Sequence, residues 1–333
     1  MKDFPIRIAG IGHYAPEKIV SNQDFERIMD TSDEWIKSRS GIERRHYADP
    51  TQASSDLGYL ASLEALKDAH ISSEQIDLII VGTSSPDMLF PSTACIIADK
   101  LHCKNSMAFD VSAGCSGFSY SLSIASQFLK TGTYKNALVI GTDTISRFID
   151  FSDRSTAVLF GDGAGALLLT TDQAKSNAIL ATTNGSDGSG ACHLLMPAGG
   201  SRRPATCASV MDHDHFVKMN GKEIFKFAVR VSDLIIDQLL ADAGLKPEDV
   251  DHYLFHQANF RIIESAAKRL HLPDSKVIVT LDEYGNTSSA TVPISLSVCT
   301  KSGRIKNGDL ILIAVFGAGL TWSGALVRWN LNG

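Results

Sequence analysis

The sequence has 333 residues, of which 44% are hydrophobic and 20% are charged, as is ordinary for a globular protein. Its formal net charge of −6 disfavours nonspecific binding to nucleic acid, because such binding depends on clustered Lys and Arg. The N-terminal stretch lacks the apolar core of a secretory signal, and no apolar run has the length of a membrane span. We therefore expect a cytoplasmic protein with neither a nucleic-acid nor a membrane partner.

The cysteine and histidine patterns argue against two kinds of site. The six cysteines include no C-x-x-C pair, and six in 333 residues are too few for a disulfide scaffold. His213 and His215 form a short His-x-His pattern, but no further ligand cluster lies near it in the sequence. We therefore expect reduced thiols and no metal site.

Helical patterns and short apolar runs alternate along the chain. Apolar residues recur at helical spacing over 55–69 and again over 228–243. Runs bounded by Gly, Asp or Asn indicate buried strands at 78–81, 137–140, 164–169, 253–255, 277–279 and 310–315. The polar, Gly-rich stretch 184–218 is expected to be an excursion outside the core. This alternation predicts an α/β fold.

Two sequence repeats suggest that one unit is used twice. DAHISSEQIDL at 68–78 resembles DAGLKPEDVDH at 242–252, at an offset of 174, and TGTYKN at 131–136 resembles SGRIKN at 302–307, at an offset of 171. We predict two α/β halves, 1–172 and 173–333, packed as one compact unit. The second offset aligns Cys115 with Asn286, so pseudo-twofold symmetry would bring both residues to a shared centre.

Three polar residues follow predicted strands or precede predicted helices. Cys115, in DVSAGCSGF, would sit at a helix N-terminus, which favours the reactive thiolate, although a buried Cys is often inert. His256 ends an apolar run and is placed like a base or hydrogen-bond donor, or like a satisfied structural His. Asn286, in YGNTSSA, is either an N-cap or an uncharged donor to developing negative charge.

The FGAGL segment at 316–320 follows the last predicted strand. Its backbone N–H groups could face an anion, or the segment could be a tight turn. Neither this segment nor FGDGAG at 160–165 opens the strand–helix unit that a dinucleotide site requires.

Several motifs in order resemble one family, the β-ketoacyl-acyl carrier protein synthases III. They are TSDEWIKSRSGIERRH (31–46), DVSAGCSGF (110–118), SDRSTAVLFGDGAGA (152–166), MNGKEIFKFAV (219–229), HQANFRII (256–263), YGNTSSA (284–290) and FGAGLTW (316–322). The resemblance spans nearly the whole chain. It implies the thiolase fold, a duplicated five-layer αβαβα sandwich, usually as a homodimer.

The resemblance also implies a catalytic set of Cys115, His256 and Asn286. The Cys115 thiol would take an acyl group from acyl-CoA, with acetyl-CoA the expected starter, and His256 and Asn286 would stabilise the charge formed when malonyl-acyl carrier protein loses CO2. The backbone N–H groups of Cys115 and Ala318 would form the oxyanion hole. No metal, nucleotide or redox cofactor is implied.

Binding residues carry over by the same motifs. Trp35 and Arg154 resemble the pair that sandwiches the adenine of CoA, and Arg39 resembles a phosphate partner. Asn259 and Gly221 resemble residues of the pantetheine tunnel.

Further positions resemble the acyl pocket and the carrier-protein surface. Phe225 and Phe316 match tunnel or pocket walls, and Phe90 matches a residue that reaches across the dimer into the partner's acyl pocket. Lys226 and Arg261 resemble the basic patch that docks the acidic carrier protein.

The chain departs from the family pattern in three places. Gly317-Ala318-Gly319 stands where three glycines are usual, Ser-Gly follows Trp322 where Gly-Ser is usual, and the 184–218 excursion is long. These departures leave the starter acyl group open. An alternative is a related condensing or acyl-transfer enzyme of secondary metabolism, and another is a non-catalytic binding module on the same fold. Asn286 argues against a hydroxymethylglutaryl-CoA synthase, which uses a Glu, and against elongating synthases, which use a second His.

Overall fold

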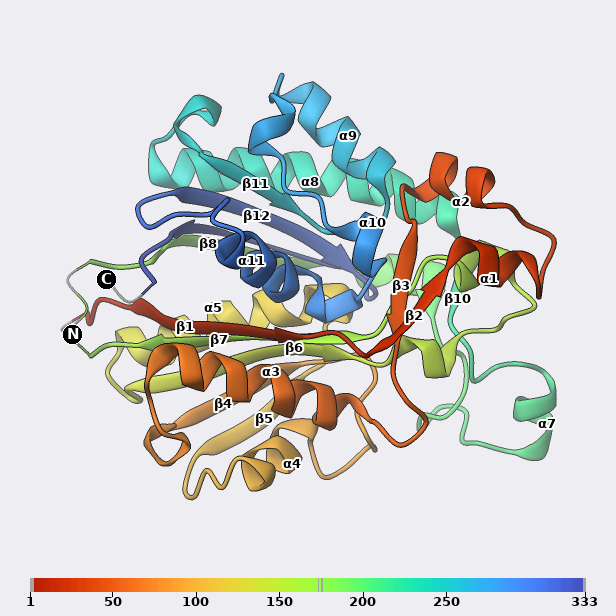
Figure 1. Cartoon of the computed structure of the whole chain (residues 1–333), viewed down its shortest axis with the longest axis horizontal. Coiled ribbons are helices and arrows are strands. Elements are labelled where there is room, and N and C mark those ends of the chain that lie inside the picture. Colours follow the sequence, from red (N-terminus) through yellow and green to blue (C-terminus); the bar gives the residue numbers. More distant parts are fainter. Residues whose placement is uncertain (1–2, 173, 175, 332–333) are drawn as a thin grey trace.

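Two β-sheets, each with helices on both faces, make up the computed structural model, which describes residues 3–172, 174 and 176–331 (Figure 1). Helices α3 (Ser54–Ala69) and α4 (Thr93–Lys100) cover the outer face of one sheet, and α8 (Gly221–Ala243) and α9 (Phe260–Arg269) lie beyond the other. Helices α5 (Gly117–Lys130) and α11 (Thr291–Lys301) lie between the sheets. The predicted five-layer αβαβα arrangement is confirmed.

The first sheet is built from the N-terminal half of the chain. Its strands in spatial order are β5 (Met107–Val111), β4 (Leu78–Gly82), β6 (Asn136–Asp143), β7 (Gly163–Thr170) and β1 (Arg7–Tyr14). Strand β4 runs parallel to β5 and β6, whereas β7 is antiparallel to β6 and β1. Every residue of β4, β6 and β7 is buried, as expected for strands covered on both faces.

The second sheet repeats this order with strands of the C-terminal half. Its strands are β11 (His252–Phe255), β12 (Leu310–Gly317), β13 (Thr321–Arg328) and β8 (Ile179–Ser186). Strand β11 is parallel to β12, and β13 is antiparallel to β12 and β8. The boundary predicted between residues 172 and 173 falls between β7 and β8. Residue 173 lies outside the described residues, so that boundary stays a prediction.

The strand predicted at 277–279 does not form. Only an isolated parallel bridge joins Val277 to Tyr253, at the place where β5 stands in the first sheet. The segment between the 3-10 turn Asp274–Lys276 and α10 (Leu281–Tyr284) is too short for a ladder. Side chains bind its carbonyls instead, since Gln257 Nε2 donates to Ile278 O and Arg304 donates to Val277 O.

The structure changes the predicted pairing of Cys115. Helices α5 and α11 begin at residues 117 and 291, and strands β6 and β12 begin at 136 and 310, so both pairs are offset by 174. At this offset Cys115 aligns with Ser289 and not with Asn286. The backbone agrees, because Gly114 and Ser288 both have positive φ, of 55° and 53°. The offset of 171 at the second repeat arises because α11 has 11 residues and α5 has 14. The turn between α11 and β12 is longer than the turn between α5 and β6, so the offset returns to 174 at the strands.

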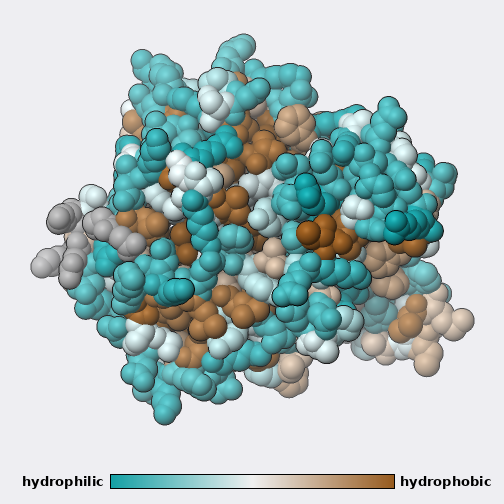
Figure 2. All heavy atoms as spheres, in the orientation of Figure 1, coloured by the Kyte–Doolittle hydropathy of each residue, from teal (hydrophilic) through white to brown (hydrophobic). Residues whose placement is uncertain are grey.

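Smaller elements surround the sheets. They are the ribbon of β2 (Lys18–Ser21) and β3 (Arg44–Tyr47), and helices α1 (Asn22–Glu26), α2 (Asp33–Ser40) and α6 (Arg154–Ala157). Residues 184–186 of the predicted excursion belong to β8 instead, because their backbone pairs with β13. The rest holds the short pair β9 (Leu194–Leu195) and β10 (Lys218–Met219) and the projecting helix α7 (Cys207–Met211), where Figure 2 shows hydrophobic groups at the surface.

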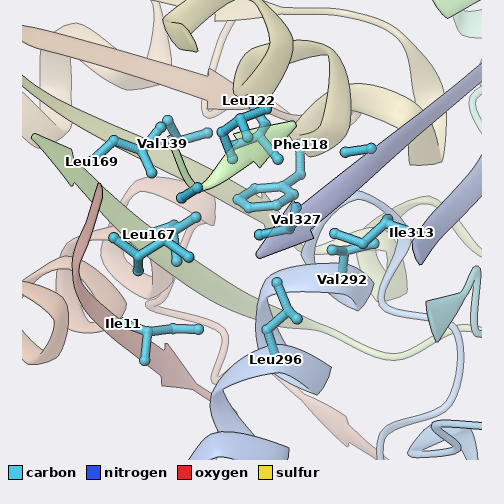
Figure 3. Packing of buried hydrophobic residues seen from close by; sticks show 14 of the residues in the cluster. Ile11, Phe118, Leu122, Val139, Leu167, Leu169, Val292, Leu296, Ile313 and Val327 are labelled. Atoms are coloured by element: carbon cyan, nitrogen blue, oxygen red, sulfur yellow. The ribbon is translucent and has the colours of Figure 1, made fainter. Parts of the chain in front are cut away.

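The main core lies between the two sheets. In Figure 3, Phe118 and Leu122 of α5 and Val292 and Leu296 of α11 meet side chains that project from both sheets. Phe118 is 1% exposed. Each large apolar side chain that is buried contributes roughly 1.5–3 kcal/mol to the stability of the folded protein, so this packing fixes α5 and α11 in the middle layer. Cys115 lies in the turn just before α5, and Asn286 lies just before the turn that leads into α11.

Candidate active site

Cys115 lies in a 3-10 turn, Gly114–Ser116, which leads directly into α5. Gly114 has φ of 55°, and a Cβ there would lie 2.5 Å from Ala318 N, so only glycine fits. A Cβ at Gly317 would likewise overlap Cys115 N. Thr321 Oγ1 donates a hydrogen bond of 2.7 Å to Ala113 O. The end of β12 therefore packs backbone to backbone against the turn that carries the thiol.

The Cys115 thiol is 9% exposed and is not a free thiolate. Burial raises the pKa of Cys115 to about 12, although a hydrogen bond from the Ser288 side chain opposes this, and the charge of Asp143 raises it further. The sequence predicted that the helix N-terminus would favour the thiolate. In the closed site, desolvation outweighs that effect, so the resting group is a neutral thiol.

His256 follows β11 and is 2% exposed. Its backbone N donates to Ala314 O, and its ring stands edge-on to Phe316, with centroids 5.1 Å apart. Burial lowers the pKa of His256 to about 3, so its ring is neutral near pH 7. Within the described part of the chain, Nδ1 has no hydrogen-bond partner. A satisfied structural histidine would have one, so hydrogen bonding at Nδ1 does not account for this buried ring, and His256 lines the cavity described below.

Asn286 follows Gly285, which has φ of 64°, and is 5% exposed. Its Oδ1 accepts a hydrogen bond of 2.9 Å from Ser288 N, and its backbone N donates to Leu159 O. Because the amide oxygen is engaged, Nδ2 is the part of the side chain left to donate. Thr287 and Ala290 are the N-caps of the turn and helix that follow, so Asn286 does not fill that alternative role.

One cavity of about 540 Å3 joins these three side chains. Its volume falls within the range of roughly 300–1,000 Å3 that is typical of small-molecule sites. The predicted residues that line it are Trp35, Arg39, Cys115, Gly221, Phe225, Lys226, His256, Asn259, Arg261, Asn286 and Phe316. The fold therefore gathers most of the predicted site residues, from both halves, around a single space.

The part of the cavity lined by α2, α8 and α9 is basic. Arg39, Lys222, Lys226 and Arg261 all line it, on a chain whose net charge is −6. Arg261 also donates a hydrogen bond of 2.9 Å to Ser38 O, which ties α9 to α2. A local cluster of cations attracts anionic ligands even when the net charge is negative.

Comparisons with known proteins agree with this geometry. Residues 109–188 match the family described as "3-Oxoacyl-[acyl-carrier-protein (ACP)] synthase III", and residues 240–329 match the C-terminal region of the same family. A β-ketoacyl-[acyl-carrier-protein] synthase III of Caldanaerobacter subterraneus subsp. tengcongensis is 52% identical, and the match covers 97% of each chain. The chain belongs to the 3-oxoacyl-[acyl-carrier-protein] synthase III family.

Solved structures show the same relationship. The 3-oxoacyl-[acyl-carrier-protein] synthase III of Aquifex aeolicus VF5 is 44% identical with a TM-score of 0.90, over 97% of this chain and all of that one. The priming β-ketosynthase of the R1128 polyketide pathway is 34% identical, also with a TM-score of 0.90, over 100% of this chain and 98% of that one. The thiolase-like fold class and the condensing-enzyme class of acyltransferase are thereby established.

In this synthase, three predicted residues lie outside the cavity lining. Phe90 is 83% exposed. Arg154 lies with its guanidinium 5.0 Å from the centre of the Trp35 ring, and also donates to Asp30 O. A planar ring placed between them would need two contact distances of about 3.5 Å, which together exceed the present 5.0 Å separation.

Ala318, the third of these residues, lies at the end of β12 next to Gly114. Ala318 is not among the described non-glycine residues with positive φ, whereas Gly319 has φ of 139°. Alanine therefore fits this position without backbone strain, and its N–H is retained. The replacement of the usual glycine leaves the proposed oxyanion donor in place.

The two histidines of the His-x-His pattern have protein partners. His213 Nδ1 lies 2.8 Å from Asp150 Oδ2, and His215 Nε2 lies 2.9 Å from Ser209 Oγ. Across residues 3–172, 174 and 176–331, no group of three His, Cys, Asp or Glu side chains is arranged to hold a metal, and no helix is long and apolar enough to cross a membrane.

Sequence reasoning missed a second set of residues in the synthase. Leu159 and Phe160 line the cavity, and their motif was recognised without a role for them. Asp143, Ser288 and Ser289 are fully or nearly fully buried beside Cys115 and Asn286. The Ser pair stands in YGNTSSA, but nothing in the sequence indicates that Asp143 contacts Ser289 from 146 residues away.

Proposed function

We propose that this synthase condenses an acyl-CoA starter with malonyl-acyl carrier protein and so initiates fatty-acid synthesis through a thioester on Cys115. The observation that carries the proposal is that Cys115, His256 and Asn286 line one cavity whose other residues include Trp35 and Arg39. Family membership and the names of the relatives support the same reaction.

In the first half-reaction, Cys115 Sγ attacks the thioester carbonyl of acyl-CoA. The sulfur–carbon bond to Cys115 forms, the bond to CoA breaks, and CoA leaves as a thiol that carries the proton. Because the pKa of Cys115 is raised to about 12, its proton has to leave as the new bond forms. The N–H groups of Cys115 and Ala318 hold the tetrahedral oxyanion.

In the second half-reaction, the malonyl unit loses CO2. The electron pair of the broken carbon–carbon bond moves onto the thioester, where His256 and Asn286 donate hydrogen bonds to the enolate oxygen. The new carbanion attacks the Cys115 thioester, the bond to sulfur breaks, and the thiol is restored by uptake of one proton. A neutral His256 suits this role, because it donates to an oxyanion without carrying a competing charge.

The remaining roles are proposed with the reaction. Trp35, Arg154 and Arg39 bind the nucleotide of CoA, Gly221 and Asn259 line the pantetheine path, and Phe225 and Phe316 form its wall. Lys226 and Arg261 dock the acidic carrier protein. Phe90 enters the partner subunit of a cytoplasmic homodimer, which agrees with the exposure of this large apolar side chain. No cofactor takes part.

The starter acyl group is proposed to be acetyl. A bulkier starter of secondary metabolism is the second candidate, because a priming β-ketosynthase of a polyketide pathway is similar and Leu194 of the 184–218 segment lines the cavity. A panel of acyl-CoAs, with mass spectrometry of the Cys115 adduct and of the product, separates the two. Loading of a long or aromatic acyl group while acetyl-CoA stays inert would exclude the acetyl proposal.

A further inference from the structure

Asp143, the last residue of β6, is a fully buried carboxyl group that the reaction above does not use. Burying a carboxylate is costly unless hydrogen bonds or an opposite charge replace its water. Among the described residues it has no ion-pair partner, and every hydrogen bond it accepts comes from an uncharged group. A buried carboxyl group that accepts this many hydrogen bonds holds the segments that donate them in place.

The two carboxylate oxygens of Asp143 bind different halves of the molecule. Oδ1 accepts from Thr83 Oγ1 at 3.1 Å, from Ser84 N at 2.7 Å and from Ser85 Oγ at 2.7 Å, all in the loop that follows β4. Oδ2 accepts from Ser289 N at 2.9 Å, in the C-terminal half. One side chain therefore joins the end of the first sheet to the turn that follows Asn286.

That turn contacts both catalytic segments. Ser288 N donates to Asn286 Oδ1 at 2.9 Å and thereby sets the direction of the Asn286 amide. Ser289 Oγ donates to Gly114 O at 2.9 Å, one residue before Cys115. Ser288 also has φ of 53°, a conformation that a non-glycine residue keeps only when its surroundings fix it.

The pseudo-twofold relation places a glycine in one half where the other half has Asp143. At the offset of 174, Asp143 corresponds to Gly317, and Ser289 corresponds to Cys115. Gly317 has no side chain over Cys115 N, and a Cβ there would lie 2.4 Å from that atom. In the other half, the equivalent N–H is that of Ser289, and it donates a hydrogen bond to the Asp143 side chain. The two turns are built alike, and in one of them a carboxyl group of the protein itself accepts the hydrogen bond.

We propose that Asp143 is a positioning residue for this active site. It does not line the cavity, and besides the effect of its charge on the pKa of Cys115 it acts through its hydrogen bonds. It holds the Ser288–Ser289 turn, which orients the Asn286 amide and supports the Gly114–Cys115 turn. This inference rests on the proposed condensation as the activity that is measured.

Asp143→Asn tests the proposal with little change in volume. An amide has one oxygen and one NH2, so it cannot accept from both Ser84 N and Ser289 N, which lie on opposite oxygens of the carboxylate. We expect kcat for condensation of acetyl-CoA with malonyl-acyl carrier protein to fall about 10- to 100-fold, since small displacements of catalytic groups have effects of this order. The KM for acetyl-CoA should change less than about threefold, because Asp143 does not line the cavity.

Asp110→Asn is the matched control. Asp110 is less buried than Asp143, but its two oxygens likewise accept from two backbone N–H groups, Thr93 N and Ala94 N, which belong to α4. Thr83→Val is a second control, because it removes one donor to Oδ1 and the acceptor of Ser85 N but leaves the bond to Ser289 intact. Both should keep kcat within about threefold of the wild type.

All rates are expressed per molecule that acetyl-CoA can acylate, counted by intact mass, so loss of folded enzyme does not imitate loss of kcat. An Asp143→Asn enzyme with wild-type kcat per acylated molecule, or an equal loss in either control, would overturn the proposal. If Asp143→Asn does not fold, Ser289→Ala is measured instead, because it removes only the hydrogen bond to Gly114 O. A kcat of Ser289→Ala equal to that of the wild type would overturn the proposal. A wild type that does not condense the two substrates contradicts the proposed function instead.

Discussion

Replacing His256 by glutamine should make the stability of the protein less sensitive to acid. Burial lowers the pKa of His256 from 6.5 to about 3. A group with a depressed folded pKa contributes its full stability above the unfolded pKa and loses it as pH falls through the folded pKa. The loss therefore begins below pH 6.5 and is complete near pH 3. Each pKa unit corresponds to about 1.4 kcal/mol, so the wild type should lose about 2 kcal/mol through this residue between pH 7 and pH 5.

The assay is urea unfolding of both proteins at pH 7 and pH 5, at one fixed protein concentration so that association does not contribute. Other titrating groups are common to both proteins and cancel in the difference. His102→Asn is a control at an exposed histidine whose left-handed backbone, with φ of 58°, asparagine tolerates. An identical pH dependence in the wild type and in His256→Gln would refute the buried neutral imidazole, and with it the proposed donor role.

Three further predictions concern the thiol, its turn and the basic cluster. Alkylation of Cys115 by iodoacetamide should rise about tenfold per pH unit from pH 7 to pH 10, because its pKa is about 12; a plateau near pH 7 would show that the helix N-terminus outweighs burial. Gly114→Ala should cost at least about 2 kcal/mol in urea unfolding and abolish acylation, since its φ is 55° and a Cβ would meet Ala318 N; wild-type behaviour would contradict this packing. Lys226→Glu should raise the KM for malonyl-acyl carrier protein about tenfold at low salt and less at high salt. Lys268→Glu, which breaks a comparable helix ion pair outside the cavity, should leave this KM unchanged. Equal effects of the two substitutions would exclude docking at the cavity mouth by Lys226.

The duplication could be read from the sequence because strands buried on both faces appear as short apolar runs between amphipathic helices. The alignment of Cys115 with Asn286 was wrong, because the repeat at 302–307 follows a helix that ends three residues early. The predicted strand at 277–279 has suitable residues, but flanking turns and side-chain hydrogen bonds to its carbonyls leave only one bridge.

For the site, most of the residues predicted from the motifs line the cavity, because each motif is a short contiguous segment that the sequence alone shows. The motifs could not indicate the state of those residues. The raised pKa of Cys115 comes from burial by both halves together, and the stacking of Arg154 on Trp35 comes from segments more than 100 residues apart. The link from Asp143 to Ser289 is likewise tertiary, and no local pattern marks it.

The central claim is that Cys115 carries the acyl group and that Asn286 acts only after loading. The most direct measurement is the intact mass of the protein after acetyl-CoA is added, and again after malonyl-acyl carrier protein is added, with release of CO2 recorded. The wild type should gain one acetyl group and then lose it as CO2 and the 3-ketoacyl product appear. Cys115→Ser should gain none, and Asn286→Ala should gain the acetyl group and keep it. Equal loss of loading in both variants, or discharge by Asn286→Ala at the wild-type rate, would contradict the account.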